Sequence, residues 1–212
     1  MDYNYIVIEG NIGSGKTSLA GLIADQNNAR LILEQFGDNP YLPRFYSDPE
    51  RYSFPLELSF LASRYTQLSK ELSNIDLFKP LVIADYVFSK SLIFAGVTLK
   101  PEEFTIYRQI FNIINRNLPR PDLLVYLYLP VGRLLQNIKT RGREFEQNIS
   151  PEYLEKLHLG YMNWLNYQRD IKILIIDMSG MDFVNRKEDF EKIENCIFGK
   201  KMKIGINRLL LS

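Results

Sequence analysis

Cysteine and histidine are nearly absent from this 212-residue sequence, with one of each, Cys196 and His158. A single cysteine excludes a disulfide framework and a cysteine-rich zinc site, and it suits a reducing compartment. No segment has the roughly 18 consecutive apolar residues that a membrane-spanning helix needs. The first residues also lack the basic and apolar regions of a secretory signal. We therefore expect a soluble, cytoplasmic protein that does not interact with membranes.

An excess of charge of one sign is also missing. Lys and Arg number 26 against 25 Asp and Glu, a formal net charge of +1, which argues against a polybasic nucleic-acid-binding protein and against an acidic tail. The 46% hydrophobic and 24% charged residues are typical of a folded globular chain. No repeat, low-complexity tract or linker interrupts the sequence. We expect one domain over residues 1–198, followed by a loosely ordered tail over 199–212, where no period is evident.

Short apolar runs alternate with longer helical patterns along the chain. Nearly continuous apolar runs are typical of strands that are covered on both faces, and their alternation with helices indicates a parallel sheet. We therefore predict an α/β fold with a five-stranded parallel sheet flanked by helices. The five predicted strands are Tyr5–Ile8, Arg30–Leu33, Leu81–Ala84, Leu123–Leu127 and Lys172–Ile176.

Three helical patterns have recognisable starts. One begins after Pro55 and places leucines and a tyrosine at spacings of three and four. Another begins at Pro101, with acidic residues in its first turn that suit the helix dipole. The third follows Ser150–Pro151, an N-cap residue and a first-turn proline.

A phosphate-binding loop follows the first predicted strand. The segment fits the pattern G-x-x-x-x-G-K-[ST] in full and directly precedes a helical pattern, which is the context that confirms the motif. Small residues let backbone N–H groups surround a phosphate, the lysine reaches the β and γ oxygens, and the final hydroxyl can ligate Mg²⁺. We predict that these residues bind ATP: Gly10, Asn11, Ile12, Gly13, Ser14, Gly15, Lys16 and Thr17.

Such a loop needs a second acidic group for the metal, usually at the end of another strand. Asp85 ends the predicted strand Leu81–Ala84, at the edge where ligands gather in open α/β sheets. We favour a role in holding Mg²⁺ together with Thr17. The alternative is that Asp85 caps the next helix.

A basic cluster lies further along the chain. Arg133, Lys139, Arg141 and Arg143 fall within eleven positions, and Gly142 is typical of a helix C-terminus. Arginines on such a turn can act as a lid that stabilises the charge on a transferred phosphoryl group. The alternative is an ordinary solvated basic face.

Several segments together resemble the deoxynucleoside kinases, and among them the bacterial purine deoxynucleoside kinases of the deoxyadenosine/deoxyguanosine type. The likeness runs from about Tyr5 to Leu165. Besides the phosphate-binding loop, two segments are far more specific to this family. They are Tyr46–Phe54 and Arg141–Gln147, the latter followed by Glu152–His158. The resemblance implies a P-loop kinase fold with an arginine-rich lid, and phosphorylation of a deoxynucleoside 5′-hydroxyl by ATP in nucleotide salvage.

The resemblance also implies residue roles. Glu34 falls where the family has its catalytic carboxylate, which can accept the 5′-hydroxyl proton. Tyr46 and Glu146 fall where the family holds the sugar 3′-hydroxyl, and Arg141 and Arg143 match its lid arginines. Members of the family pair as homodimers through helices, and the patterns after Pro55 and Pro101 have enough apolar surface for this.

Two positions depart from the family pattern. The family usually has a glutamine where this chain has Glu57, which we expect to share a helix face with Arg64. An ionised carboxylate offers only acceptors, and guanine presents two adjacent donors, so we predict that deoxyguanosine is accepted and preferred. A protonated Glu57 would act like glutamine and admit adenine. We expect Glu57, Arg64 and Asp85 to bind the substrate.

The second departure is a missing arginine after the third strand. The run Asp85–Phe88 lacks the arginine that the family normally shows there, and Lys90, Arg64 or another lid group can take its place.

Two other classes of function remain open. A nucleoside monophosphate kinase of the thymidylate kinase type would need an arginine pair for the acceptor phosphate, for which Arg44 and Arg51 are candidates. A non-catalytic nucleotide-binding module would keep Lys16 but would not need Glu34.

Overall fold

The computed structural model describes residues 3–37, 39–74 and 76–210. Within them a parallel sheet has six strands, in the order β2-β3-β1-β4-β5-β6. The strands are β1 (Tyr5–Gly10), β2 (Arg30–Ile32), β3 (Val82–Ala84), β4 (Leu123–Tyr128), β5 (Lys172–Asp177) and β6 (Gly205–Leu210). The helices are α1 (Lys16–Gln26), α2 (Leu42–Ser47), α3 (Pro49–Ser73), α4 (Lys90–Thr98), α5 (Pro101–Asn115), α6 (Val131–Arg141), α7 (Pro151–Tyr167) and α8 (Lys187–Phe198), with a 3-10 turn η1 (Glu144–Glu146).

The prediction of five strands is wrong by one. All five predicted strands form, and β6 adds a sixth from the stretch that we expected to be a tail. Its register pairs Ile206 with Ile173 on β5. Leu211 and Ser212, the end of that stretch, lie outside the described residues.

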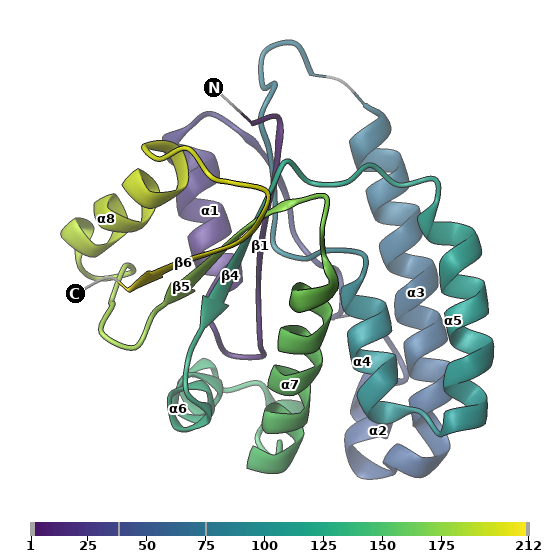
Figure 1. Ribbon diagram of the computed structural model, residues 1–212. Helices are drawn as coiled ribbons and strands as arrows, with labels where there is room; N and C mark the ends of the chain where they lie inside the picture. Colours follow the sequence, from purple (N-terminus) through teal and green to yellow (C-terminus); the bar gives the residue numbers. More distant parts are fainter. Residues whose placement is uncertain (1–2, 38, 75, 211–212) are drawn as a thin grey trace.

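Two layers of helices cover the sheet because its strands are apolar on both faces. On β1, Ile6 and Ile8 join one core cluster that includes residues of α1 and α8, whereas Tyr5 and Val7 join another that includes residues of α3, α5 and α7. Figure 1 shows α1 and α8 on one side of the sheet and the long helices α3, α5 and α7 on the other.

Helix α3 begins earlier than predicted. It starts at Pro49, where the Asp48 side chain accepts a hydrogen bond from the Arg51 N–H, so that Asp48 is the cap and Pro49 occupies the first turn. Pro55 lies inside the helix, and the 25-residue length tolerates the one bond that a proline removes. The predicted start of α5 at Pro101 and the Ser150 cap of α7 are both confirmed.

The loop from β1 to α1, the start of α7 and the turn after α6 meet at one end of the molecule (Figure 1). This is the carboxyl end of the parallel strands, where open α/β sheets bind ligands. In the described residues no helix is both long and apolar enough to cross a membrane.

Candidate active site

The phosphate-binding loop has the backbone shape that its glycines allow. Gly13 and Gly15 have φ angles of +81° and +87°, in the left-handed region that side-chain-bearing residues rarely adopt. A Cβ atom on Gly13 would also lie 2.7 Å from the Leu134 carbonyl oxygen. Asn137 on α6 fixes the loop by donating from Nδ2 to the Gly13 carbonyl at 2.8 Å. The two glycines and the Asn137 hydrogen bond therefore fix the conformation of the loop that leads into α1.

Not every predicted ATP-binding residue faces a cavity. Gly10 lies against Ser14 and the Leu127 carbonyl, with no room for a Cβ atom. Asn11 is buried, donates from Nδ2 to the Leu154 carbonyl at 2.8 Å and accepts from the Ile12 N–H. These residues shape the loop, whereas the loop residues that line cavities are Ile12, Gly13, Ser14, Gly15, Lys16 and Thr17.

The Lys16 side chain contacts the backbone of its own loop. Its Nζ donates to the Asn11 carbonyl at 3.2 Å. Burial, the largest cause, and the positive charge of Lys90 together lower its pKa to about 8, against the opposing effect of nearby carboxylates. A half-buried ammonium group with another cation nearby is favourably placed to bind an anionic phosphate.

Asp85 lies next to Thr17, as the metal hypothesis requires. The Thr17 hydroxyl donates to Asp85 Oδ2 at 2.5 Å, and the Glu34 N–H donates to Oδ1 at 2.7 Å. Both carboxylate oxygens thus face the phosphate-binding loop and the end of β2. In the described chain we see no hydrogen bond from Asp85 to the start of α4, which disfavours the capping alternative.

The residues at this position fit a magnesium ion. Mg²⁺ prefers hard oxygen ligands and usually takes only one or two from the protein, with water and phosphate oxygens completing its shell. Thr17 and Asp85 supply one hydroxyl and one carboxylate. Among the described residues no cluster of three or more His, Cys, Asp or Glu side chains can form an all-protein metal cage.

Glu34 is the most heavily paired carboxylate of the site. Arg64 donates to Oε1 from Nε at 2.9 Å and from Nη2 at 2.7 Å, and Lys90 donates to Oε2 at 2.6 Å. Burial alone would raise the pKa of Glu34, but Lys90 and Arg64 outweigh it and hold the pKa far below its usual range. Glu34 is therefore ionised at neutral pH.

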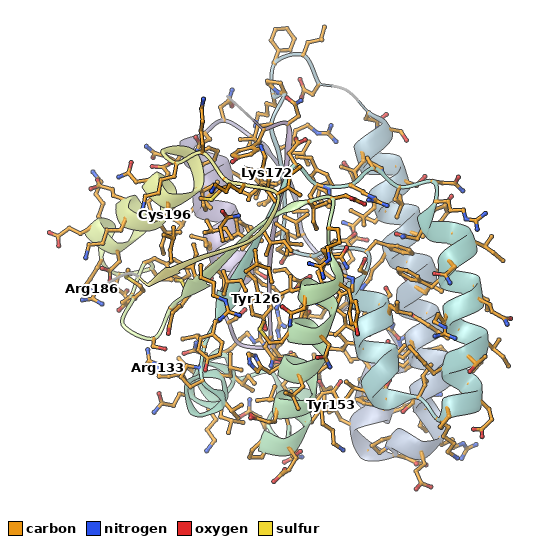
Figure 2. The ribbon with its side chains drawn as sticks, in the orientation of Figure 1. Tyr126, Arg133, Tyr153, Lys172, Arg186 and Cys196 are labelled. Carbon is orange, nitrogen blue, oxygen red and sulfur yellow. The ribbon has the colours of Figure 1, made fainter. Side chains whose placement is uncertain are left out.

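A single cavity brings together most of the predicted site, with walls from the phosphate-binding loop, the end of β2, α3 and the turn after α6. Aromatic side chains form much of its wall. Tyr153, labelled in Figure 2 on α7, is one of them. The predicted site residues that line the cavity are Ile12, Lys16, Thr17, Glu34, Tyr46, Glu57, Arg64, Asp85, Arg141, Arg143 and Glu146.

Glu57 presents a carboxylate deep in this cavity. The residue is 2% exposed. Its Oε1 lies 3.0 Å from the Thr98 hydroxyl, and its Oε2 is buried without a hydrogen-bond partner among the described residues. Burial raises the pKa of Glu57 to about 7, although Arg64 and Thr98 oppose the rise. A buried acceptor without a partner costs free energy until a ligand supplies a donor.

The Thr98 hydroxyl can form a hydrogen bond with Glu57 in either charge state of the carboxyl group. Its oxygen also lies 3.0 Å from the Phe94 carbonyl oxygen, and a hydroxyl has one proton to donate. When that proton goes to Phe94, a protonated Glu57 can donate to the Thr98 oxygen. When Glu57 is ionised, Thr98 can turn its proton to Oε1. The pair can therefore accommodate both charge states of Glu57.

The lid arginines are paired with the predicted sugar-binding carboxylate. Arg141, the last residue of α6, and Arg143 both bond to Glu146, which is 6% exposed. Gly142 between them has a φ of +74° and ends α6, as predicted. The turn η1 has two glutamates: Glu144 is exposed to solvent, and Glu146 lines the cavity.

Tyr46 lies in the same region. Its ring stacks on Phe145 at a centroid distance of 6.0 Å. Burial raises the pKa of Tyr46 above its usual value, and the charge of Glu146 raises it further. The phenol is therefore protonated at neutral pH and can donate a hydrogen bond.

A second cavity lies on the other side of the phosphate-binding loop. It is bounded by α6, where Figure 2 labels Arg133, and by the segment after β5. Its lining from that segment includes Met181, Asp182 and Phe183. The residues shared by both cavities are Lys16, Thr17, Arg141 and Arg143. The two cavities thus adjoin at the phosphate-binding loop and the turn after α6.

The family model described as deoxynucleoside kinase matches residues 6–202. The chain belongs to the deoxynucleoside kinase family. It is therefore a phosphotransferase that acts on deoxynucleosides, with ATP as the phosphoryl donor.

Similar family members cover nearly the whole chain. The deoxyguanosine kinase of Bacillus subtilis is 37% identical over 193 residues, 89% of this chain and 93% of that protein. The deoxyadenosine/deoxycytidine kinase of the same organism is 31% identical over 200 residues, 91% of this chain and 90% of that protein. A solved structure of deoxyadenosine kinase from M. mycoides with dCMP and dCDP aligns with a TM-score of 0.79 at 24% identity, covering 92% of this chain and 100% of that one. The last likeness shows the fold.

The structure adds site residues whose position sequence reasoning did not settle. Lys90 is 5% exposed and reaches Glu34, and the only sequence signal for it was the missing family arginine. Glu9, at the end of β1, was missed entirely. Its buried carboxylate accepts from the N–H groups of Gly10 and Val87 and from the Tyr161 hydroxyl, each at 3.0 Å. Glu9 thus ties the phosphate-binding loop to the turn after Asp85.

Proposed function

We propose that this kinase phosphorylates the 5′-hydroxyl of purine deoxynucleosides and prefers deoxyguanosine. The observation that carries the proposal is the buried Glu57 carboxylate with its unpartnered Oε2, which lies in the first of the two cavities, called the acceptor cavity from here on. Guanine presents N1–H and the N2 amino group side by side, and an ionised carboxylate can accept from both. The match to a deoxyguanosine kinase at 37% identity supports the same base.

Adenine fits the protonated form of the same residue. Adenine pairs an acceptor, N1, with a donor, the N6 amino group, and a neutral carboxylic acid offers the complementary donor and acceptor. With a pKa of about 7, Glu57 has access to both forms near neutral pH. Deoxyadenosine is therefore the second substrate of this proposal.

The other site residues take roles around this acceptor. Tyr46 and Glu146 hold the sugar 3′-hydroxyl. The loop amides and Lys16 bind the donor phosphates, and Arg141 and Arg143 stabilise the charge on the transferred phosphoryl group. Thr17 and Asp85 would hold Mg²⁺, which neutralises phosphate charge when bound.

Glu34 accepts the proton of the 5′-hydroxyl. With its pKa held far below the usual range, Glu34 is a weak base. We infer that it orients the hydroxyl and takes the proton late, when bond formation to phosphorus has made that proton acidic. A loose transition state for phosphoryl transfer, which needs little early deprotonation, is compatible with this order.

The deciding experiment measures ADP release with each of the four natural deoxynucleosides, for the wild type and for Glu57→Gln. We expect kcat/KM for deoxyguanosine to exceed that for deoxyadenosine by about tenfold or more in the wild type, and the ratio to fall in the variant. Glu191→Gln, an exposed change on α8, is the matched control. An unchanged ratio in Glu57→Gln would overturn the base assignment.

The structure disfavours the monophosphate kinase alternative. The arginine pair that it would need, Arg44 and Arg51, is exposed, and both guanidinium groups lie over the ring of Tyr52. Neither is among the described residues that line the two cavities. Substituting deoxyguanosine 5′-monophosphate for deoxyguanosine in the same assay tests this, and we expect no ADP release above background.

The non-catalytic alternative is tested by Glu34→Gln. We expect kcat to fall by at least about 100-fold, within the range for loss of a positioned proton acceptor. Full turnover in this variant would overturn the role of Glu34.

We also propose that the enzyme is a cytoplasmic homodimer. The outer face of α5 has the exposed side chains Ile106 and Ile113, seven residues apart and thus on one face, and α5 lies beside α3. The single cysteine, Cys196, is free and buried, as suits a reducing compartment. Sedimentation of the wild type and of Ile106→Glu/Ile113→Glu tests the dimer, and a monomeric wild type would overturn it.

A further inference from the structure

Lys90 occupies a position in the reaction centre that the family likeness leaves unassigned. It is the first residue of α4, five residues after Asp85, and its side chain is nearly buried. It lines the acceptor cavity together with Glu34, Lys16 and Asp85. Its Nζ lies 2.6 Å from Glu34 Oε2 and 5.4 Å from the centre of the Phe94 ring.

The hydrogen bonds of Glu34 show which oxygen is available to the substrate. Each carboxylate oxygen offers about two lone-pair positions. Oε1 receives two bonds from Arg64, so its positions are filled. Oε2 receives one bond, from Lys90, and keeps one position free. A 5′-hydroxyl that donates to Glu34 therefore binds at Oε2, next to the Lys90 ammonium group.

We propose that Lys90 is a catalytic cation on the acceptor side of the phosphoryl transfer, which fixes Glu34 Oε2 with one N–H and contacts the reacting oxygens with another. The proposal rests on the proton-accepting role of Glu34 proposed above. In the step, the 5′-oxygen forms a bond to the γ-phosphorus, and the bond from that phosphorus to the β–γ bridging oxygen breaks. ADP leaves with the electron pair, and the hydroxyl proton passes to Glu34 Oε2 and then to water.

The chemistry of lysine suits this position. An ammonium group is a compact charge with three donors, so one bond to Oε2 leaves two for other acceptors. Arg64 is placed differently: Nε and Nη2 both donate to Oε1, the oxygen whose positions are filled, and Nη1 donates to the Ser91 hydroxyl at 2.9 Å. Of these two partners of Glu34, Lys90 is thus the one that contacts the oxygen with a free position.

The charges around the cavity support the same placement. Lys16, from the phosphate-binding loop, and Lys90, from the start of α4, both line the acceptor cavity. Two like charges near one cavity repel each other until an anion lies between them. The transferred phosphoryl group is such an anion, and its charge would be stabilised from both sides.

The test uses Lys90→Met, which keeps the length of the side chain without its charge, and Lys90→Arg, which keeps the charge. We expect Lys90→Met to lower kcat by about 100-fold or more, the effect of removing one donor to developing charge, with the KM for deoxyguanosine changed less than about threefold. Lys90→Arg should recover part of the loss. Ethylammonium added to Lys90→Ala should raise its kcat, because a free cation can enter the space left by the side chain.

The control is Lys70→Met, an exposed lysine in the last turn of α3, which should match the wild type. Thermal melts identify any variant that fails to fold, and Lys90→Gln, with a neutral donor to Oε2, then replaces Lys90→Met. A loss that Lys90→Arg does not reduce and ethylammonium does not rescue would mean a structural role and overturn the proposal.

These measurements distinguish a failure of the Lys90 proposal from a failure of the proposed role of Glu34, on which it rests. A wild type that consumes ATP with deoxyguanosine while Lys90→Met keeps its full kcat overturns the Lys90 proposal alone. Full turnover by Glu34→Gln removes the Glu34 role and the Lys90 proposal with it, and leaves the kinase activity standing. Non-additive losses in Glu34→Gln/Lys90→Met support a shared function of the two side chains.

Discussion

The Thr17 hydroxyl lies 2.5 Å from Asp85 Oδ2, although 68 positions separate the two residues in the sequence. The contact joins the N-terminus of α1 to the end of β3. It brings together two hard oxygen donors beside the phosphate-binding loop, which is the arrangement that a Mg²⁺–nucleotide complex needs.

We expect Asp85→Asn and Thr17→Ala to raise the Mg²⁺ concentration that the reaction requires by about tenfold or more, because each removes an oxygen ligand or its support. The measurement is the Mg²⁺ concentration that gives half-maximal ADP release at saturating ATP. Thr17→Ser keeps the hydroxyl and should stay close to the wild type. Equal Mg²⁺ requirements in Thr17→Ala and Thr17→Ser would contradict this assignment.

Base preference should change with pH through Glu57. Its pKa of about 7 means that the ionised fraction rises as the pH rises through 7. The deoxyguanosine-to-deoxyadenosine ratio of kcat/KM should therefore increase from pH 6 to pH 8. Glu57→Gln has no titrating group at this position, and its ratio should be nearly constant over the same range. A ratio that changes in parallel in both proteins would point to another group.

The stability of the empty enzyme should respond to the same residue. The pKa of Glu57 is raised on folding from 4.5 to about 7, so the folded state keeps a proton that the unfolded state has lost. The corresponding stability is fully present below about pH 4.5 and is lost as the pH rises through 7, by roughly 3 kcal/mol. Urea melts at pH 5 and pH 8 should show Glu57→Gln gaining stability relative to the wild type at the higher pH. A constant difference between the two proteins would argue against the raised pKa.

Gly13→Ala should impair the phosphate-binding loop. The φ of +81° costs an alanine about 1–2 kcal/mol, and its Cβ would meet the Leu134 carbonyl oxygen at 2.7 Å. We expect a lower melting temperature and a higher KM for ATP, with the KM for deoxyguanosine less affected. Gly132→Ala, at a position where a Cβ meets nothing within 4 Å, is the control. If both glycine variants had the same KM for ATP, the shape of the loop would not depend on Gly13.

The parts of the fold with local signals could be predicted from the sequence. Five strands and the starts of α5 and α7 follow from apolar runs and caps, and all are confirmed. The strand β6 was missed because Asn207 and Arg208 interrupt its apolar run, and the backbone pairing with β5 that holds it is not visible in the sequence. The start of α3 was misplaced because both Pro49 and Pro55 suit a first turn, and only the Asp48 cap distinguishes them.

The candidate site, like the fold, has parts that local sequence signals predict and parts that they do not. The phosphate-binding loop is a contiguous motif with its own chemistry, so the sequence alone was enough to find it. Glu34, Tyr46 and Glu146 come from distant segments and were found through the family likeness, and the structure places them in one cavity. No pattern predicted that Glu9 would join the phosphate-binding loop to the turn after Asp85, because that contact depends on how β1 and β3 lie in the sheet.

The pairing of Arg141 and Arg143 with Glu146 has a consequence for how the two substrates influence each other. While the enzyme is empty, the negative charge of Glu146 offsets one of the two positive charges of the arginines, so the three residues together attract anions less than the two arginines alone would. In the roles proposed above, a sugar hydroxyl that binds Glu146 would compete for the oxygens that hold the arginines, and a triphosphate would compete for the arginines themselves. Binding of either substrate would thereby weaken the ion pairs that the other has to break.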